Sequence, residues 1–367
     1  MKNKDIAKIL SLVATDSGVQ NGIILPGLNI LITSYKGTEG YRQILVRNQM
    51  FGRQLAQAIF SDPKYNISAY QIKLVERITD KLEFADLPLP GQHLKIFVKT
   101  FSQGLIEHSS SVLRIVEKDT IKYFQIKTGL NLPMVYGAFV ENLYGDPLGI
   151  VVDKHPDRLD VMPLDLISEV LFEYGDYQDT YAFRCPYCGE ILTPDLVTYG
   201  KCAFCGEILP QTLYKEKTQL KSKEEIIIEK IIENLNYNPA LTYLGKNFWE
   251  IEKSGISILF QLDKDSSSLV VYTRLASLQE LKKAGHHELR KKIYDFLLKE
   301  NSGLKYMFFS LNNDNIIFST IYFYLEHITQ EKLTDYVREF IAKALDYNFQ
   351  LRNMITTPAS HQSDTHF

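Results

Sequence analysis

The four cysteines of this 367-residue chain all lie within one short segment. They form two Cys-x-x-Cys pairs in the related octapeptides CPYCGEIL and CAFCGEIL, at positions Cys185, Cys188, Cys202 and Cys205. Four thiolates complete a tetrahedral shell around one zinc ion and leave no position for a substrate. Iron fits the same set of sulfur ligands. The pattern predicts one structural metal ion, with zinc as the expected metal.

A glycine follows the second cysteine of each pair. Gly189 and Gly206 can adopt a positive φ, which turns the chain and directs backbone amides toward the sulfur atoms. A redox dithiol and two disulfides are the alternatives, but two matching pairs favour a metal. Residues 183–209 resemble a zinc ribbon. The resemblance implies a module that binds protein or nucleic acid. The alternative is a module that binds no partner and serves as a metal-stabilised hinge between two domains.

A second set of possible metal ligands lies in an aspartate-rich stretch between residues 146 and 160. Asp153, His155 and Asp157 alternate as if on one face of a strand, and oxygen and imidazole ligands at that spacing suit a divalent cation. Pro156 and the local density of aspartate equally describe a turn that leaves a strand. This stretch supports the hypothesis of an enzyme with its site in residues 1–180.

Three arginines mark a possible anion-binding surface. Arg42, Arg47 and Arg53 fall within residues 41–60, where the apolar spacing predicts a helix, and they could contact an anion or a nucleic acid. A solvated helix surface is the alternative. The chain has 41 basic and 44 acidic residues and a formal net charge of −3, which removes the argument for a dedicated nucleic-acid coat protein.

The composition indicates a globular protein of more than one domain, because 367 residues exceed one typical core. Clustered, otherwise absent cysteines favour a reducing compartment, so we expect a soluble cytoplasmic protein. No apolar run approaches the roughly 20 residues that span a bilayer, and we expect no membrane insertion. The expected domains are an N-terminal domain (1–180), the ribbon (181–212), a C-terminal domain (213–355) and a flexible tail (356–367).

Apolar periodicity predicts an α+β fold for the N-terminal domain. Residues 41–60 and 66–84 have helical spacing and residues 28–33 have strand character. Further strands are expected over residues 94–100, 112–116, 121–126, 135–143 and 148–152. The segment between 116 and 121 reads as a hairpin turn.

The C-terminal domain is expected to have the order α-β-β-β-α-β-β-α with an antiparallel sheet. Ser222 and Glu225 have the spacing of a capping box, which marks the start of the first helix. The later elements are expected over residues 248–251, 256–262, 269–275, 288–301, 305–311 and 316–325, with a last helix from about residue 329.

This element order, with the segments 256–263, 269–275 and 316–325, resembles the class I type III secretion chaperones, or Tir chaperone family, and the related YbjN-like domains. The resemblance implies dimerisation, an apolar groove for an extended partner segment and no catalytic residues. We therefore expect a non-enzymatic protein-binding adaptor or chaperone-like factor, with a protein partner or self-association through residues 213–355. The alternatives are a nucleic-acid-associated factor that uses the ribbon and the basic helix, and an enzyme with its site in residues 1–180.

Overall fold

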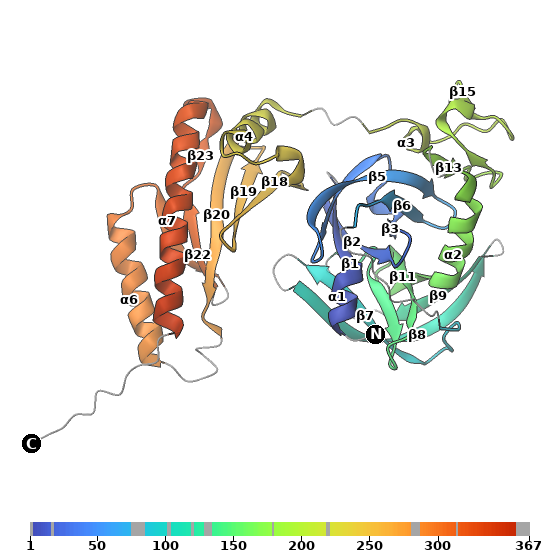
Figure 1. Cartoon of the computed structure of the whole chain (residues 1–367), viewed down its shortest axis with the longest axis horizontal. Coiled ribbons are helices and arrows are strands. Elements are labelled where there is room, and N and C mark those ends of the chain that lie inside the picture. Colours follow the sequence, from blue (N-terminus) through green and yellow to red (C-terminus); the bar gives the residue numbers. More distant parts are fainter. Residues whose placement is uncertain are drawn as a thin grey trace, which may run out of the picture. The chain divides into compact units, whose positions relative to one another are not determined.

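Figure 1 shows the computed structural model of the chain. It describes residues 3–15, 18–74, 85–100, 104–118, 121–127, 134–177, 180–217, 221–279, 287–312 and 315–356. The chain divides into two compact units. Unit 1 comprises Met1–Gln219 with Leu244–Lys246, and unit 2 comprises Leu220–Tyr243 with Asn247–Phe367.

Unit 1 begins with a six-stranded antiparallel barrel. The strands follow the order β1-β2-β3-β6-β5-β4, and the pairing of β4 with β1 closes the ring. Helix α1 (Asn3–Ile9) precedes the barrel, and the short helix η1 (Tyr35–Gly37) follows its third strand. The strands are β1 (Leu10–Thr15), β2 (Gly18–Leu25), β3 (Ile30–Ser34), β4 (Gln43–Asn48), β5 (Gly52–Asp62) and β6 (Ile67–Gln71).

A second six-stranded barrel repeats this topology. Its order is β7-β8-β9-β12-β11-β10, with β10 paired to β7, so the two barrels connect equivalent strands in the same way. Helices α2 (Leu164–Glu173) and η2 (Gly175–Tyr177) follow it. The strands are β7 (His93–Thr100), β8 (Gly104–Lys118), β9 (Ile121–Lys127), β10 (Phe139–Asn142), β11 (Pro147–Lys154) and β12 (Arg158–Pro163).

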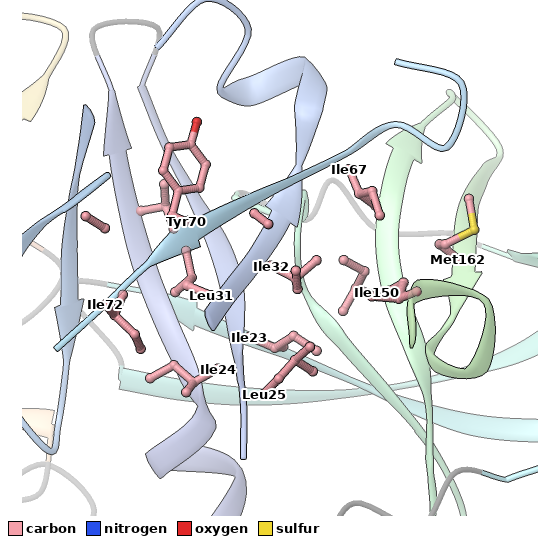
Figure 2. Close-up of a cluster of buried hydrophobic side chains, with 14 of the residues drawn as sticks. Ile23, Ile24, Leu25, Leu31, Ile32, Ile67, Tyr70, Ile72, Ile150 and Met162 are labelled. Carbon is pink, nitrogen blue, oxygen red and sulfur yellow. The ribbon is translucent and has the colours of Figure 1, made fainter. Parts of the chain in front are cut away.

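The two barrels share an apolar core. Figure 2 shows Ile32 and Ile67 of the first barrel near Ile150 and Met162 of the second, and all four side chains belong to one buried cluster. Asn21 adds polar contacts between the barrels, since its side-chain amide donates to the carbonyl of Met134 at 2.6 Å and accepts from the N–H of Lys99 at 2.7 Å. The barrels are therefore packed into one body.

The expected α+β fold for the N-terminal domain is wrong, because this region is almost entirely β. Residues 41–60 form β4 and most of β5, and residues 67–71 form β6, where helices were expected. The rest of the second expected helix, 75–84, lies outside the described residues. Ile44, Leu45 and Val46 are consecutive and all buried, so the two-residue period of the strand is hidden. The expected strands from residue 94 onward coincide with β7 to β11.

The cysteine segment extends the first barrel. Strand β13 (Ala182–Arg184) pairs in parallel with β5, with Ala182 opposite Phe60, and in antiparallel fashion with β14 (Ile191–Leu192). A second hairpin, in which Val197 lies opposite Cys202, leads into the second cysteine pair. The remaining elements are η3 (Pro194–Leu196), β15 (Val197–Thr198), β16 (Lys201–Cys202) and α3 (Gln211–Tyr214).

Unit 2 is an antiparallel sheet with helices. The sheet order within this unit is β18-β19-β20-β22-β21, with β23 paired to β20, and helix α7 contacts β20. The order expected from the sequence is corrected by two additional short strands, β17 and β23. The elements are α4 (Lys223–Asn234), η4 (Pro239–Leu241), β17 (Tyr243–Gly245), β18 (Phe248–Lys253), β19 (Ile256–Asp263), β20 (Ser268–Ser277), α6 (His287–Gly303), β21 (Met307–Asn312), β22 (Asn315–Thr320), β23 (Phe323–Tyr324), η5 (Leu325–His327) and α7 (Gln330–Thr356).

The first helix of unit 2 begins at a capping box, and its last helix ends at the expected tail. The capping box at Ser222 and Glu225 is confirmed, because each residue's side chain accepts a hydrogen bond from the other's backbone N–H. Thr356 ends α7, and the rest of the expected tail lies outside the described residues. Among the helices that the structure describes, none has the length and apolar character needed to cross a membrane.

Candidate functional site

The four cysteine sulfurs converge at one point. Sγ of Cys185 lies 3.8 Å from Sγ of Cys205, and Sγ of Cys188 lies 3.8 Å from Sγ of Cys202. A tetrahedron with zinc–sulfur bonds of about 2.3 Å has sulfur–sulfur edges of about 3.8 Å. All four thiols are free, and disulfide sulfurs would lie only about 2.05 Å apart. The cluster can therefore hold one metal ion.

Both cysteine pairs use the same backbone turn. Gly189 and Gly206 have φ values of +82° and +77°. The N–H of Gly189 donates to the carbonyl of Cys185 at 3.1 Å, and that of Gly206 donates to the carbonyl of Cys202 at 2.9 Å. The N–H of Tyr187 donates to Sγ of Cys185 at 3.5 Å, so a backbone amide points toward a thiol in the first turn, as the glycine positions predicted.

A cleft of about 520 Å³ opens in unit 1. Its walls come from η1, the turn between β5 and β6, strands β8, β9, β11 and β12, and the first cysteine pair. The lining side chains are mixed in character, with charged and tyrosine residues among them: Tyr35, Lys36, Glu39, Pro63, Lys64, Tyr65, Asn66, Lys118, Ile121, Tyr123, Val152, Asp153, Asp160, Met162 and Pro186. We call this space the cleft.

Two aspartates that line the cleft lie beside a histidine, and the three together are possible metal ligands. Asp153 and Asp160 face each other across the β11–β12 pair, and His155 lies in the turn that joins these strands. Nε2 of His155 is 3.2 Å from Oδ2 of Asp160 and 4.0 Å from Oδ2 of Asp153. One ligand atom from each residue lies within 4.8 Å of the other two.

The turn between β11 and β12 separates Asp157 from this group. The Asp157 side chain is 72 % exposed and pairs with Arg158 at 3.1 Å, whereas the Asp160 side chain is 14 % exposed. The expected face of Asp153, His155 and Asp157 is thus replaced by Asp153, His155 and Asp160. A hairpin centred on residues 155–157 pairs 153 with 160, and Pro156 with its flanking aspartate was the sequence signal for that turn.

Two further cleft residues connect the barrels. The ammonium of Lys36, on η1, contacts the carboxylate of Asp153, on β11. Asn66 accepts from the N–H of Lys36 at 3.1 Å and donates to the carbonyl of Val152 at 2.7 Å. The φ of Asn66 is +54°, a conformation that asparagine tolerates better than most residues. Asn66 therefore holds the β5–β6 turn against β11.

The three arginines expected on a basic helix lie on or next to strands. Arg42 is buried, donates to the carbonyl of Leu213 at 2.8 Å and stacks on Tyr181. Arg47 and Arg53 are opposite each other in the β4–β5 pair. The arrangement does not bring the three guanidinium groups together on one exposed helical face.

No protein-family model matches this sequence, and no curated protein matches it. Solved structures do match parts of it. The HtrA-type protease AlgWS227A with a tripeptide has a TM-score of 0.39 and 19 % identity, over 46 % of this chain and 62 % of that chain. The protease Rv3671c of Mycobacterium tuberculosis, in an inactive form, has a TM-score of 0.40 and 13 % identity, over 49 % and 94 %. The Yersinia pestis serine endoprotease has a TM-score of 0.40 and 16 % identity, over 47 % and 65 %.

Two expectations are corrected by the fold. The resemblance to secretion chaperones, which concerned residues 213–355, does not account for the chain, because its N-terminal half folds into two six-stranded antiparallel barrels. The expected function as a non-enzymatic adaptor or chaperone-like factor rested on that resemblance and is withdrawn with it. At these identities the likeness is one of fold.

Proposed function

We propose that unit 1 is an enzyme whose site is the cleft, with a divalent metal ion held by Asp153, His155 and Asp160. The observation that carries this proposal is the convergence of two carboxylate oxygens and one imidazole nitrogen within 4.8 Å. Both aspartates line the cleft, so an ion bound there has open positions for water and substrate. One imidazole with two carboxylates suits manganese, iron or zinc.

The charges around the cleft favour an anionic substrate. Lys36, Lys64 and Lys118 line it together with three carboxylates, two of which the bound metal would neutralise. The ammonium of Lys36 now pairs with Asp153, and a cation at that carboxylate would release it toward the substrate. A phosphate or carboxylate group could then be bound by the metal and the lysines together.

The reaction that such a site supports is hydrolysis. A divalent ion held by Asp153, His155 and Asp160 would supply an activated water for attack on an electrophilic carbon or phosphorus. Lys36 and Lys64, which line the cleft, would bind the anionic group of the substrate.

We propose that the metal in the four-cysteine cluster is zinc and that its role is structural. The sulfur–sulfur distances of 3.8 Å fit zinc–sulfur bonds, and four thiolate ligands leave no open position. Free thiols in this arrangement support a reducing compartment, and we propose the cytoplasm.

The proposal is tested by hydrolysis of p-nitrophenyl phosphate and p-nitrophenyl acetate by the full chain, with and without Mn²⁺. Asp160→Asn removes a ligand charge, and Asp157→Asn is the matched control, because Asp157 points away from the cluster. We expect Mn²⁺-stimulated turnover in the wild type and the control, and a loss of about 100-fold in Asp160→Asn. Equal activity in the two variants would refute the site.

A further inference from the structure

The first cysteine pair forms part of the cleft wall. Pro186, between Cys185 and Cys188, lines the cleft next to Pro63, Lys64 and Tyr65 of the β5–β6 turn. The backbone turn of residues 185–189 is therefore in a position to affect the shape of the cleft. What connects the two turns is the side chain of Arg184, the residue that precedes the first metal ligand.

Arg184 is bonded to three separate parts of unit 1. Its Nε donates to Oδ2 of Asp62 at 2.7 Å, one terminal nitrogen donates to the carbonyl of Gly189 at 2.8 Å, and the other contacts the carboxylate of Glu173 on α2. The side chain is 9 % exposed. The partner at Gly189 is the carbonyl of the left-handed glycine that shapes the first cysteine pair.

Asp62 in turn shapes the cleft turn. Its Oδ1 accepts from the N–H of Lys64 at 3.1 Å and from the N–H of Tyr65 at 3.2 Å. The guanidinium of Arg184 also lies over the Tyr65 ring, 5.3 Å from its centre. The same turn ends at Asn66, which is bonded to Lys36 and Val152 on other walls of the cleft.

These contacts form one chain from the cysteine cluster to the cleft. Apart from two of the cysteines, the buried apolar side chains of residues 183–209 are those of Phe183, Leu192 and Leu209, and so small a core leaves the turns dependent on metal. Loss of the metal would free Gly189 and weaken the hold of Arg184 on Asp62. We infer that Arg184 is a positioning residue through which metal in the four-cysteine cluster fixes the β5–β6 turn, and with it the cleft. This inference goes beyond the proposed hydrolysis, since it concerns the shape of the cleft whatever reaction occurs there.

The test is hydrogen exchange of the full chain, followed in the peptide that covers residues 62–66. We compare zinc-loaded protein, protein stripped with 1,10-phenanthroline, and zinc-loaded Arg184→Met. The matched control is Arg338→Met, which alters an exposed arginine in unit 2. We expect exchange in residues 62–66 to rise about tenfold in the stripped protein and in Arg184→Met, with bound zinc retained in the variant. Peptides of β8 and β9 should exchange as in the wild type.

Two results would overturn the inference. One is unchanged exchange at residues 62–66 after the zinc has been removed from the wild type, which tests the coupling without any substitution. The other is wild-type exchange in zinc-loaded Arg184→Met, which would show that Arg184 does not carry the coupling. The exchange of zinc-loaded Arg184→Met depends neither on catalysis nor on metal removal at Asp153 and Asp160, so the inference and the proposed function fail separately.

Discussion

The carboxylate of Asp62, which is fully buried, accepts a hydrogen bond of 2.7 Å from the guanidinium of Arg184. Asp62 ends a strand of the first barrel, and Arg184 precedes the first cysteine of the metal cluster. Burial raises the pKa of Asp62, and the charge and hydrogen bond of Arg184 oppose that rise. This pair thus joins the metal cluster to the barrel at a place from which water is excluded.

We expect Asp62→Ala to destabilise unit 1 by about 3–5 kcal/mol, because it leaves the buried Arg184 without its main partner. Urea unfolding of the full chain measures this loss. Asp62→Ala combined with Arg184→Met should cost less than the sum of the two single changes, because the unpaired charge is then absent. Strict additivity of the two changes would show that the residues do not interact.

Cys202→Ser should abolish metal binding at the four-cysteine cluster, because it removes one of the four ligands. Elemental analysis of the purified chain is expected to give one zinc ion per wild-type chain and almost none in the variant. Phe204→Ser is the matched control, since Phe204 lies between the second pair of cysteines and is exposed. Retention of zinc by Cys202→Ser would contradict the four-ligand site.

Gly137 lies where the two barrels meet, and a Cβ atom there would be 1.8 Å from the carbonyl oxygen of Asn21. We expect Gly137→Ala to destabilise unit 1 by about 3 kcal/mol or more, because backbone atoms must move apart. Gly104→Ala is a close control. Gly104 has φ +72° against +71° for Gly137, but nothing lies within 4 Å of its added Cβ. Its cost should be about 1–2 kcal/mol, from the left-handed φ alone. Equal losses in urea unfolding would refute steric overlap as the cause.

Lys99 gives unit 1 a pH-dependent stability. Burial, together with the positive charge of Arg47, lowers the pKa of Lys99 from 10.5 to about 8. Between these values the unfolded chain binds the proton and the folded chain does not, so this lysine's contribution to stability increases as pH rises from 8 toward 10.5. We expect the free energy of unfolding of the wild type, relative to Lys99→Met, to increase between pH 7.5 and 9.5. A constant difference would contradict a lowered pKa.

The four cysteines of the cluster could be predicted from the sequence, because two Cys-x-x-Cys pairs with following glycines specify both the ligands and the turns locally. The barrels were hidden for a physical reason. Ile44, Leu45 and Val46 are apolar on both faces of one strand, a pattern that a buried helix also shows. The pairing of Asp153 with Asp160 depends on hairpin register rather than on spacing along one strand. The contact of Arg184 with Asp62 joins residues 122 positions apart, which no local pattern reveals.

The expected protein partner or self-association through residues 213–355 stays a prediction.

The most direct test of the proposed enzyme site is a Mn²⁺ titration of the zinc-loaded chain, followed by electron paramagnetic resonance of the free ion. We expect one Mn²⁺ to bind to the wild type and to Asp157→Asn, and affinity to fall by about 10- to 100-fold in Asp160→Asn, with the zinc content unchanged. Absence of Mn²⁺ binding to the wild type, or equal binding by both variants, would contradict a metal site at Asp153, His155 and Asp160.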